Sequence, residues 1–264
     1  MHILVVGGGM GGTILANNLA RRLSGELEQG SSKITMLSAS DKHMYQPGLL
    51  YVAVGKMSTT ELYRDQKSLL EPSIDFHVDP VEKFDLDNNS VTTKSGKKIS
   101  YDIICIATGS RGNAAGIPGL AENACQFYTE ADALAMYKKL QKFEGGKVVV
   151  ATGVPHKCPM SPLEITFFLI DYFKKRGIWD KVDLHYTYPI GRVHSLEPVA
   201  KWAAPEFDKE GVTYETLFNM KEVVPGKVIS EEDSSAEFDL LVTVPPHKGM
   251  QVIEDNELGL SLIH

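Results

Sequence analysis

Short, continuous apolar runs alternate with amphipathic stretches along this chain of 264 residues. The runs "HILVV", "IICIA", "VVVA" and "LLVTV" have the length and composition of strands that are buried on both faces. The stretches after "HILVV" and "VVVA" have the spacing of amphipathic helices. Strands that alternate with helices in this way are typical of parallel α/β folds. We therefore predict an α/β protein with two Rossmann-like domains.

A glycine-rich turn separates the first predicted strand from the first predicted helix. In "VVGGGMGG", Gly7, Gly9 and Gly12 have the G-x-G-x-x-G spacing of a dinucleotide-binding turn. The first glycine allows the tight turn, the second lets the backbone approach a pyrophosphate, and the third lets helix and strand pack closely. The free N–H groups at the helix start favour an anion. A glycine turn without a ligand is the alternative.

Two further segments are predicted to contact the same cofactor. The second strand, "KITMLSAS", reaches Ser38 where this fold commonly places a carboxylate for the ribose hydroxyls, and Asp41 follows nearby. The run "YDIICIATG" ends in Thr108 and Gly109, which predict a small-residue turn against the cofactor, or a strand-end turn without a ligand. The glycine motif and a distal "ATG" together favour FAD over NAD.

The second Rossmann-like domain lacks a dinucleotide fingerprint. After its strand "KVVVA" the chain reads "TGVPHKCPMSPLEI", in which Gly153 stands alone. Pro155 and Pro159 remove backbone N–H donors that a phosphate would need. This domain is therefore predicted to keep the fold without the nucleotide, which argues against a pyridine-nucleotide oxidoreductase.

Cys158, in the same loop, is the candidate catalytic residue. The sequence "SPLE" predicts a helix with Ser161 as its N-cap and Glu164 in its first turn. The positive end of that helix, together with His156 and Lys157, would stabilise a thiolate and lower its pKa. A small apolar loop residue is the alternative.

Composition narrows the classes of function. Hydrophobic residues make up 43% and charged residues 23%, as in ordinary globular proteins. The net charge of -7, without a Lys/Arg-rich run, argues against a nucleic-acid partner. No apolar run approaches the about 20 residues of a membrane span, and we find no secretory signal, so a cytoplasmic protein is expected.

The remaining cysteines and histidines give weaker signals. The three cysteines are too scattered for a disulfide framework, and no metal site is predicted, because neither the cysteines nor the histidines have ligand spacing. Cys105 lies in an apolar run and is predicted to belong to the core. Cys125 lies in the link between the domains, where it is either a redox partner or inert.

Five blocks of sequence, in order, resemble the sulfide:quinone oxidoreductase family: "VVGGGMGG", "HMYQPGLLYVAVGK", "YDIICIATGSR", "TGVPHKCPMSPLEITFFLIDYFKKRGI" and "FDLLVTVPPHKG". The resemblance implies a flavoprotein in which sulfide is oxidised at a cysteine pair carrying bridging sulfur. FAD then passes two electrons to a quinone. Because family members are membrane-associated, the resemblance also implies peripheral contact with the inner face of the cell membrane.

The resemblance implies roles for three residues and also shows departures from the family pattern. Cys158 matches the cysteine of the Cys-Pro loop, Glu164 a glutamate that relays protons near the flavin, and Pro47 the segment that lines the flavin. A further family cysteine has no clear match, because the nearby residue is Tyr128 and Cys125 lies earlier. In "PIGRVHS", an arginine occupies what is often a histidine. Family members also continue beyond "VPPHKG", with the partner of the catalytic cysteine, the quinone pocket and the membrane helices.

We predict an FAD-binding domain over residues 1–111, a second Rossmann-like domain over 112–238, and a return to the first domain over 239–264, with the C-terminal part missing. The leading hypothesis is FAD-dependent oxidation of sulfide with a quinone as electron acceptor. One alternative is an NADH:quinone-type flavoprotein. The other is a non-catalytic flavin-binding subunit that depends on a second chain. A homo-oligomer also stays open.

Overall fold

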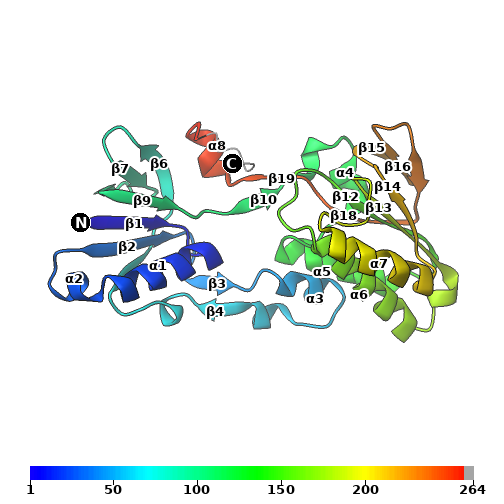
Figure 1. Cartoon of the computed structure of the whole chain (residues 1–264), viewed down its shortest axis with the longest axis horizontal. Coiled ribbons are helices and arrows are strands. Elements are labelled where there is room, and N and C mark those ends of the chain that lie inside the picture. The colour runs from blue at the N-terminus through cyan, green and yellow to red at the C-terminus, as the bar shows by residue number, and fades with distance from the viewer. Residues whose placement is uncertain (259–264) are drawn as a thin grey trace. The chain divides into compact units, whose positions relative to one another are not determined.

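The computed structural model describes residues 1–258, which form two compact units (Figure 1). The first unit comprises Met1–Tyr45, Leu62–Arg111 and the chain from Gly249 onward. The second comprises Gln46–Glu61 and Gly112–Lys248. The predicted α/β class is confirmed, because each unit is built around a parallel sheet flanked by helices.

The first unit is built on a four-stranded parallel sheet in the order β5-β2-β1-β9. Its central strand β1 pairs with β2 on one side and β9 on the other, so the predicted strand–turn–helix–strand unit is present. The helices and strands of this unit are β1 (His2–Val6), α1 (Met10–Arg22), α2 (Ser24–Glu28), β2 (Lys33–Ser38), β3 (Lys42–Met44), β4 (Tyr63–Asp65), the 3-10 helix η2 (Lys67–Leu69), β5 (Ile74–Val78), β6 (Val81–Asp85), β7 (Ser90–Thr93), β8 (Lys98–Ser100), β9 (Ile103–Ile106) and α8 (Gln251–Asp255).

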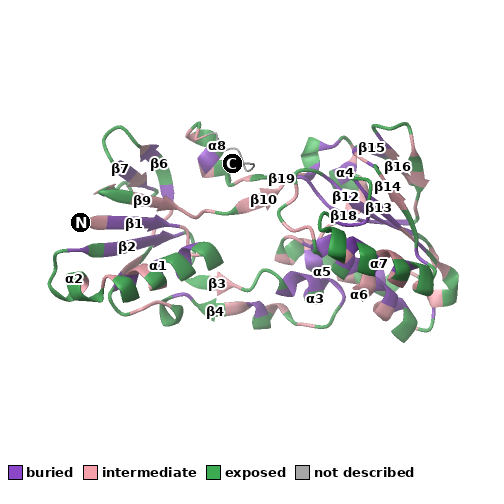
Figure 2. Ribbon diagram, viewed as in Figure 1, coloured by how far each residue is buried: buried purple, intermediate pink, exposed green. Residues whose placement is uncertain are grey.

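Alternate residues of β1 enter two different cores, because successive side chains of a strand point to opposite faces. Ile3 and Val5 pack with Ala16 and Ala20 of α1. Leu4 and Val6 pack in a second cluster with apolar residues of the antiparallel sheet β6-β7-β8 and with Ile253 of α8. The main sheet is therefore covered on both faces, and Figure 2 shows β1 and β2 as largely buried.

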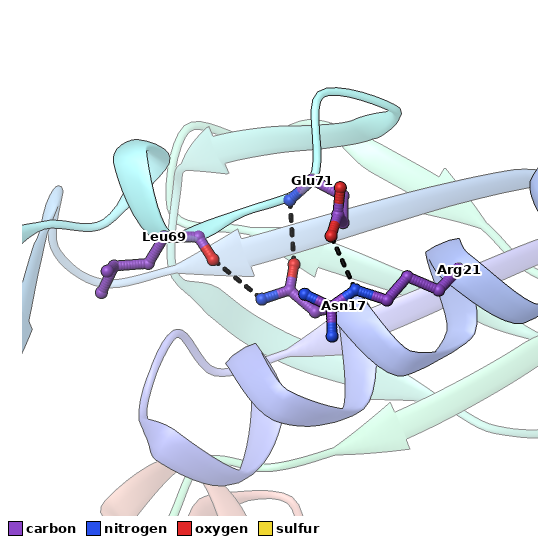
Figure 3. Close-up of polar contacts among 4 residues, drawn as sticks. All are labelled: Asn17, Arg21, Leu69 and Glu71. Atoms are coloured by element: carbon purple, nitrogen blue, oxygen red, sulfur yellow. Dashed lines mark hydrogen bonds and ion pairs between the residues drawn. The ribbon is translucent and has the colours of Figure 1, made fainter.

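Polar contacts fix α1 to the segment that precedes β5 (Figure 3). The side-chain amide of Asn17 donates to the carbonyl of Leu69 at 2.8 Å and accepts from the backbone N–H of Glu71 at 2.9 Å. Arg21 Nε donates to the Glu71 carboxylate at 2.7 Å. Because Asn17 satisfies two backbone groups at once, it contributes more to this attachment than the exposed Arg21–Glu71 pair.

The second unit is built on a five-stranded parallel sheet in the order β11-β18-β12-β13-β14. Its helices and strands are α3 (Gly48–Ala53), the 3-10 helix η3 (Ala114–Gly116), α4 (Leu120–Asn123), β11 (Ala124–Cys125), α5 (Glu130–Lys142), β12 (Gly146–Thr152), α6 (Ser161–Lys175), the 3-10 helix η4 (Trp179–Lys181), β13 (Val182–Tyr188), α7 (Glu197–Glu210), β14 (Thr213–Thr216), β15 (Met220–Val224), β16 (Lys227–Ser230), β17 (Ser235–Glu237) and β18 (Leu240–Val244). Three elements span the unit boundaries: η1 (Thr59–Leu62), β10 (Ser110–Gly112) and β19 (His247–Gly249).

The antiparallel sheet β15-β16-β17 packs against one face of this parallel sheet. Its residues Met220 and Val228 share a cluster with Val149 of β12 and Leu241 of β18. Pro225 and Gly226 form the turn between β15 and β16, since Val224 of β15 pairs with Lys227 of β16. Helix α7 ends with Gly211 in the left-handed conformation.

Strand β18 lies inside the second unit, and this differs from the expected return to the first domain at residue 239. Leu240–Val244 pairs with β12 and β11, so the strand has a parallel neighbour on each side. All five residues are buried, as its continuous apolar sequence requires. The chain returns to the first unit only at Gly249. None of the helices formed by residues 1–258 is long and apolar enough to cross a membrane.

Candidate functional site

The glycine turn between β1 and α1 has the geometry of a nucleotide-binding turn. Gly7 has φ +119°, and a Cβ atom there would overlap the carbonyl of Ala107. A Cβ atom at Gly12 would overlap the carbonyl of Gly7. A Cβ atom at Gly9 would meet nothing within 4 Å. The first and third glycines are therefore required by packing inside the protein, whereas the second faces open space that a ligand can enter.

Three strands bring the other predicted cofactor residues to the same edge of the first sheet. Val6, the last residue of β1, pairs with Leu37 of β2 and Ile106 of β9, so the segments carrying Ser38 and Thr108 follow neighbouring strand ends. Ser38 is only 7% exposed. Its hydroxyl accepts from the backbone N–H of Ser40 at 3.2 Å. Gly109 has φ +78°, which makes the turn after β9.

A buried polar network supports this turn, and no sequence motif indicates it. Gln66 is fully buried and donates from Nε2 to the Thr13 hydroxyl at 2.9 Å. His43 Nδ1 lies 3.1 Å from the Gly8 carbonyl and 3.0 Å from Gln66 Oε1. Both partners are acceptors, so Nδ1 carries the hydrogen. The network joins residues far apart in the sequence, and a spacing pattern therefore does not find it.

The loop between β12 and α6 contains Cys158 and starts at Gly153, whose backbone is packed and hydrogen-bonded within the protein. The N–H of Gly153 donates to the Val244 carbonyl at 2.8 Å. A Cβ atom at Gly153 would lie 2.5 Å from Cδ of Pro246. Gly153 is therefore required by packing against Pro246 rather than by the approach of a phosphate. At the end of β13, Tyr188 is 1% exposed and its side chain occupies the strand end.

Helix α6 begins differently from the prediction. Met160 is the N-cap, and Ser161 is the first residue of the helix rather than its cap. The Ser161 hydroxyl donates to the Cys158 carbonyl at 3.0 Å, so the same hydroxyl accepts from Tyr128 Oη at 2.6 Å. Ser161 thus fixes the backbone of Cys158 instead of capping α6. The predicted N-cap was wrong because α6 begins at Ser161 itself, and the Ser161 hydroxyl bonds to the Cys158 carbonyl and to Tyr128 rather than accepting from a backbone N–H of the first turn.

Aromatic and basic side chains surround the Cys158 loop. The Lys157 ammonium lies 5.3 Å from the Tyr128 ring centroid. The His247 ring meets Tyr128 edge-on with centroids 4.5 Å apart. His156 Nδ1 donates to the Gly153 carbonyl at 3.0 Å, and its Nε2 lies 3.4 Å from Tyr188 Oη. Tyr128 and His247 were not selected as site residues by sequence reasoning.

The arrangement of two Rossmann-like units agrees with the protein family that the sequence matches. The family model described as pyridine nucleotide-disulphide oxidoreductase matches residues 1–244. The chain belongs to this family. Its members are flavoproteins that bind FAD, and the turn described above fits that cofactor, since Gly9 leaves the backbone open at the start of α1.

Similar proteins in this family include sulfide:quinone oxidoreductases. The mitochondrial sulfide:quinone oxidoreductase of Mus musculus is 26% identical over 267 residues, covering 96% of this chain and 58% of the relative. The X-ray structure of the sulfide:quinone oxidoreductase from Aquifex aeolicus has a TM-score of 0.83 and 26% identity, covering 96% of this chain and 60% of that one. The chain thus spans less than two thirds of the length of either relative. The predicted resemblance is confirmed.

A protein of known structure with lower sequence identity shares only the fold with this chain. NDH2 from Plasmodium falciparum, solved in complex with NADH, has a TM-score of 0.72 at 16% identity, covering 97% of this chain and 57% of that one. The two-unit Rossmann-like architecture is therefore shared by proteins whose names point to different substrates. The fold therefore does not identify the substrate, and the residues of the Cys158 loop have to do so.

The other cysteines of this flavoprotein chain lie in its cores. Cys125 is 5% exposed in β11, where burial raises the pKa of its thiol. Cys105 lies in β9 against the core on the α1 side of the first sheet, and desolvation raises the pKa of its thiol as well. Cys158 is half-buried, and all three are free cysteines. Cys158 and Cys105 are thus both partly exposed, and only Cys158 lies in a loop.

Two further predicted site residues have their places in the second unit. Pro47 is the N-cap residue of α3. Glu164 lies in the first turn of α6 with its side chain at the surface, and partial desolvation by the surrounding chain raises the pKa of its carboxyl. A raised pKa is suitable for a group that exchanges protons. Their roles at the flavin stay predictions.

His247 is expected to make the protein sensitive to acid. Burial lowers its pKa from 6.5 to about 4. The unfolded chain therefore binds a proton below about pH 6.5 that the folded protein does not accept until about pH 4. Above pH 6.5 His247 does not lower the free energy of unfolding. As the pH falls from 6.5 to 4, His247 lowers the free energy of unfolding by about 3 kcal/mol. Urea unfolding at pH 7 and pH 4.5 measures this effect. Between the two pH values, the free energy of unfolding should fall less for His247→Phe than for the unchanged protein. An equal fall would contradict His247 as the acid-sensitive group.

Proposed function

We propose that this chain catalyses FAD-dependent oxidation of sulfide at Cys158, with a quinone as the electron acceptor. The observation that carries the proposal is the position of Cys158 at the start of α6, after the second sheet's strand β12, where a nucleotide-binding turn would otherwise lie. Pro246 and Tyr188 occupy the space around that position. The names of the similar proteins support sulfide and quinone as substrates.

The first unit would hold FAD through its glycine turn. Gly7, Gly9 and Gly12 place the start of α1 against the pyrophosphate, and Thr108 with Gly109 forms the neighbouring turn. Ser38 would face the ribose, and Pro47 would line the flavin. We propose that the first unit, Met1–Tyr45 and Leu62–Arg111 with the segment that starts at Gly249, is the FAD-binding domain, and that Gln46–Glu61 with Gly112–Lys248 is the second domain. FAD, when bound, supplies the two-electron acceptor for the reaction.

Residues of the second unit would perform the sulfur chemistry. Cys158, two residues before the N-cap of α6, would provide the sulfur that bonds to sulfide, with the two electrons released on S–S bond formation passing to the bound FAD and the proton to a nearby base. Glu164, with its raised pKa, would relay protons in the first turn of α6. Cys125 is a weaker candidate for a partner thiol, because it is buried and its pKa is raised. We propose the inner face of the cell membrane as the place of reaction, because a quinone is membrane-soluble.

An NADH:quinone-type function is the second candidate, favoured by the likeness to NDH2. The Cys158 loop argues against it, because packing between Gly153 and Pro246 leaves no glycine free to approach a phosphate. A flavin-binding subunit that depends on another chain is the third candidate.

Anaerobic spectroscopy of the purified protein, reconstituted with FAD, tests the proposal. Sulfide should bleach the visible flavin band, and a soluble quinone should restore it. Faster bleaching by NADH than by sulfide would support the second candidate. Protein that takes up no FAD, or that binds FAD and is bleached by neither reductant, would count against an autonomous enzyme.

A further inference from the structure

Buried polar atoms without partners gather after the strands of the second sheet. Within the described chain, Thr152 Oγ1, Thr187 Oγ1 and His247 Nε2 have no hydrogen-bond partner, and each of these residues is at most 2% exposed. Thr152 ends β12, Thr187 is next to last in β13, and His247 follows β18. Parallel α/β sheets bind ligands at the carboxyl ends of their strands. A small polar ligand is therefore expected at this edge.

His247 presents a hydrogen-bond acceptor there. Its Nδ1 lies 2.8 Å from the Pro245 carbonyl, so Nδ1 carries the hydrogen and Nε2 carries a lone pair. Burial holds the ring neutral at pH 7 by lowering its pKa to about 4. The backbone N–H of His247 donates to the Pro155 carbonyl at 2.6 Å, which fixes the residue against the Cys158 loop. The unpartnered Nε2 requires a ligand that donates a hydrogen.

Lys157 presents a positive charge over the ring of Tyr128, which also contacts His247. Its ammonium lies 5.3 Å from the centroid of the Tyr128 ring, and the Tyr128 and His247 centroids are 4.5 Å apart. No carboxylate of the described chain lies within ion-pair distance of Lys157. Although the residue is exposed as a whole, desolvation around its ammonium lowers its pKa, with a favourable contribution from the neighbouring Cys158. An anion would offset that desolvation.

We propose that Lys157 and His247 bind hydrosulfide next to Cys158, with the ammonium pairing with the anion and Nε2 accepting its S–H hydrogen. The inference rests on the proposed function, which supplies sulfide as the substrate. Hydrosulfide carries both features that the pair requires, one negative charge and one hydrogen, on a single atom. Chloride lacks the hydrogen, and water lacks the charge.

Nuclear magnetic resonance of the histidine rings tests the proposal without redox chemistry. The FAD-loaded Cys158→Ser protein, labelled with 15N-histidine, is titrated anaerobically with sodium sulfide at pH 7.5. The His247 Nε2 resonance should shift saturably, as expected when a lone pair accepts a hydrogen bond. Lys157→Met should weaken the apparent affinity about tenfold, because a charge-assisted contact is lost. Lys157→Arg should retain most of it.

Controls separate this site from general anion binding. Lys201→Met removes a 75% exposed lysine side chain on α7 and should leave the titration unchanged. Sodium chloride should not reproduce the Nε2 shift. No shift at His247, an unchanged affinity in Lys157→Met, or the same shift with chloride would each overturn the inference. If sulfide bleaches the native flavoprotein without a His247 shift, the proposed function stands and the hydrosulfide site is wrong. If sulfide shifts His247 without bleaching the flavin, the site stands and the proposed function is wrong.

Discussion

Replacing Cys158 with serine is expected to lower the rate of flavin bleaching by sulfide at least about 10³-fold, because a hydroxyl is a far weaker nucleophile than a thiolate. The fold should survive the change. Cys158 is half-buried in a loop, and its identified hydrogen bond uses the backbone carbonyl rather than the sulfur. FAD content and the urea unfolding midpoint should therefore match those of the unchanged protein. Anaerobic stopped-flow absorbance measures the rate.

Cys105→Ala is the matched control for this experiment. It removes a thiol from β9, on the core side of the first sheet, and should leave the rate of bleaching unchanged. Cys125→Ala tests whether the buried thiol of β11 acts as a redox partner. If it does, the variant should be bleached more slowly by sulfide, and if Cys125 is inert, the rate should be unchanged. Bleaching of Cys158→Ser by sulfide at the unchanged rate would exclude Cys158 as the nucleophile.

Replacing Gly12 with alanine is expected to cost about 3 kcal/mol of stability and to release FAD, because the new methyl group would overlap the Gly7 carbonyl. Helix α1 would have to move away from β1, and the turn that faces the pyrophosphate would open. The FAD retained after gel filtration and the urea unfolding midpoint measure the two effects.

Gly11→Ala is the matched control one residue earlier. A Cβ atom at Gly11 meets nothing within 4 Å, and alanine is favoured over glycine inside a helix by about 1 kcal/mol. This variant should keep FAD and be as stable as the unchanged protein or slightly more stable. If Gly12→Ala and Gly11→Ala behaved alike, the close packing of helix and turn would not be the reason for the third glycine of the motif.

Local patterns in the sequence are sufficient to indicate elements whose causes are local. The glycine turn, the Pro225-Gly226 hairpin and the α7 stop at Gly211 depend on backbone conformations that few residues adopt. The Thr129 cap of α5 is also local, since its side chain accepts from the N–H of Asp132. Such features could be placed to within a few residues without a structure.

The remaining features depend on partners distant in sequence. Whether "LLVTV" joins the first sheet or the second is decided by its neighbours β12 and β11, because a fully apolar strand suits either. Ser161 lies inside α6, and its hydroxyl bonds to Tyr128, 33 residues earlier in the sequence, as well as to the Cys158 carbonyl. Gln66 gave no signal at all, because a single buried amide has no periodicity.

The division of the chain has a consequence for how the protein is assembled during synthesis. The polypeptide passes between the two units at four points, after Tyr45, Glu61, Arg111 and Lys248. The first unit is completed by α8, whose Ile253 enters its core, and by Asn256, which accepts from the N–H of Phe84 at 2.9 Å. The first unit, although it contains the N-terminal strand β1, therefore makes all of its contacts only after the whole second unit has left the ribosome. A break at any single crossing would leave the two units joined by the other three.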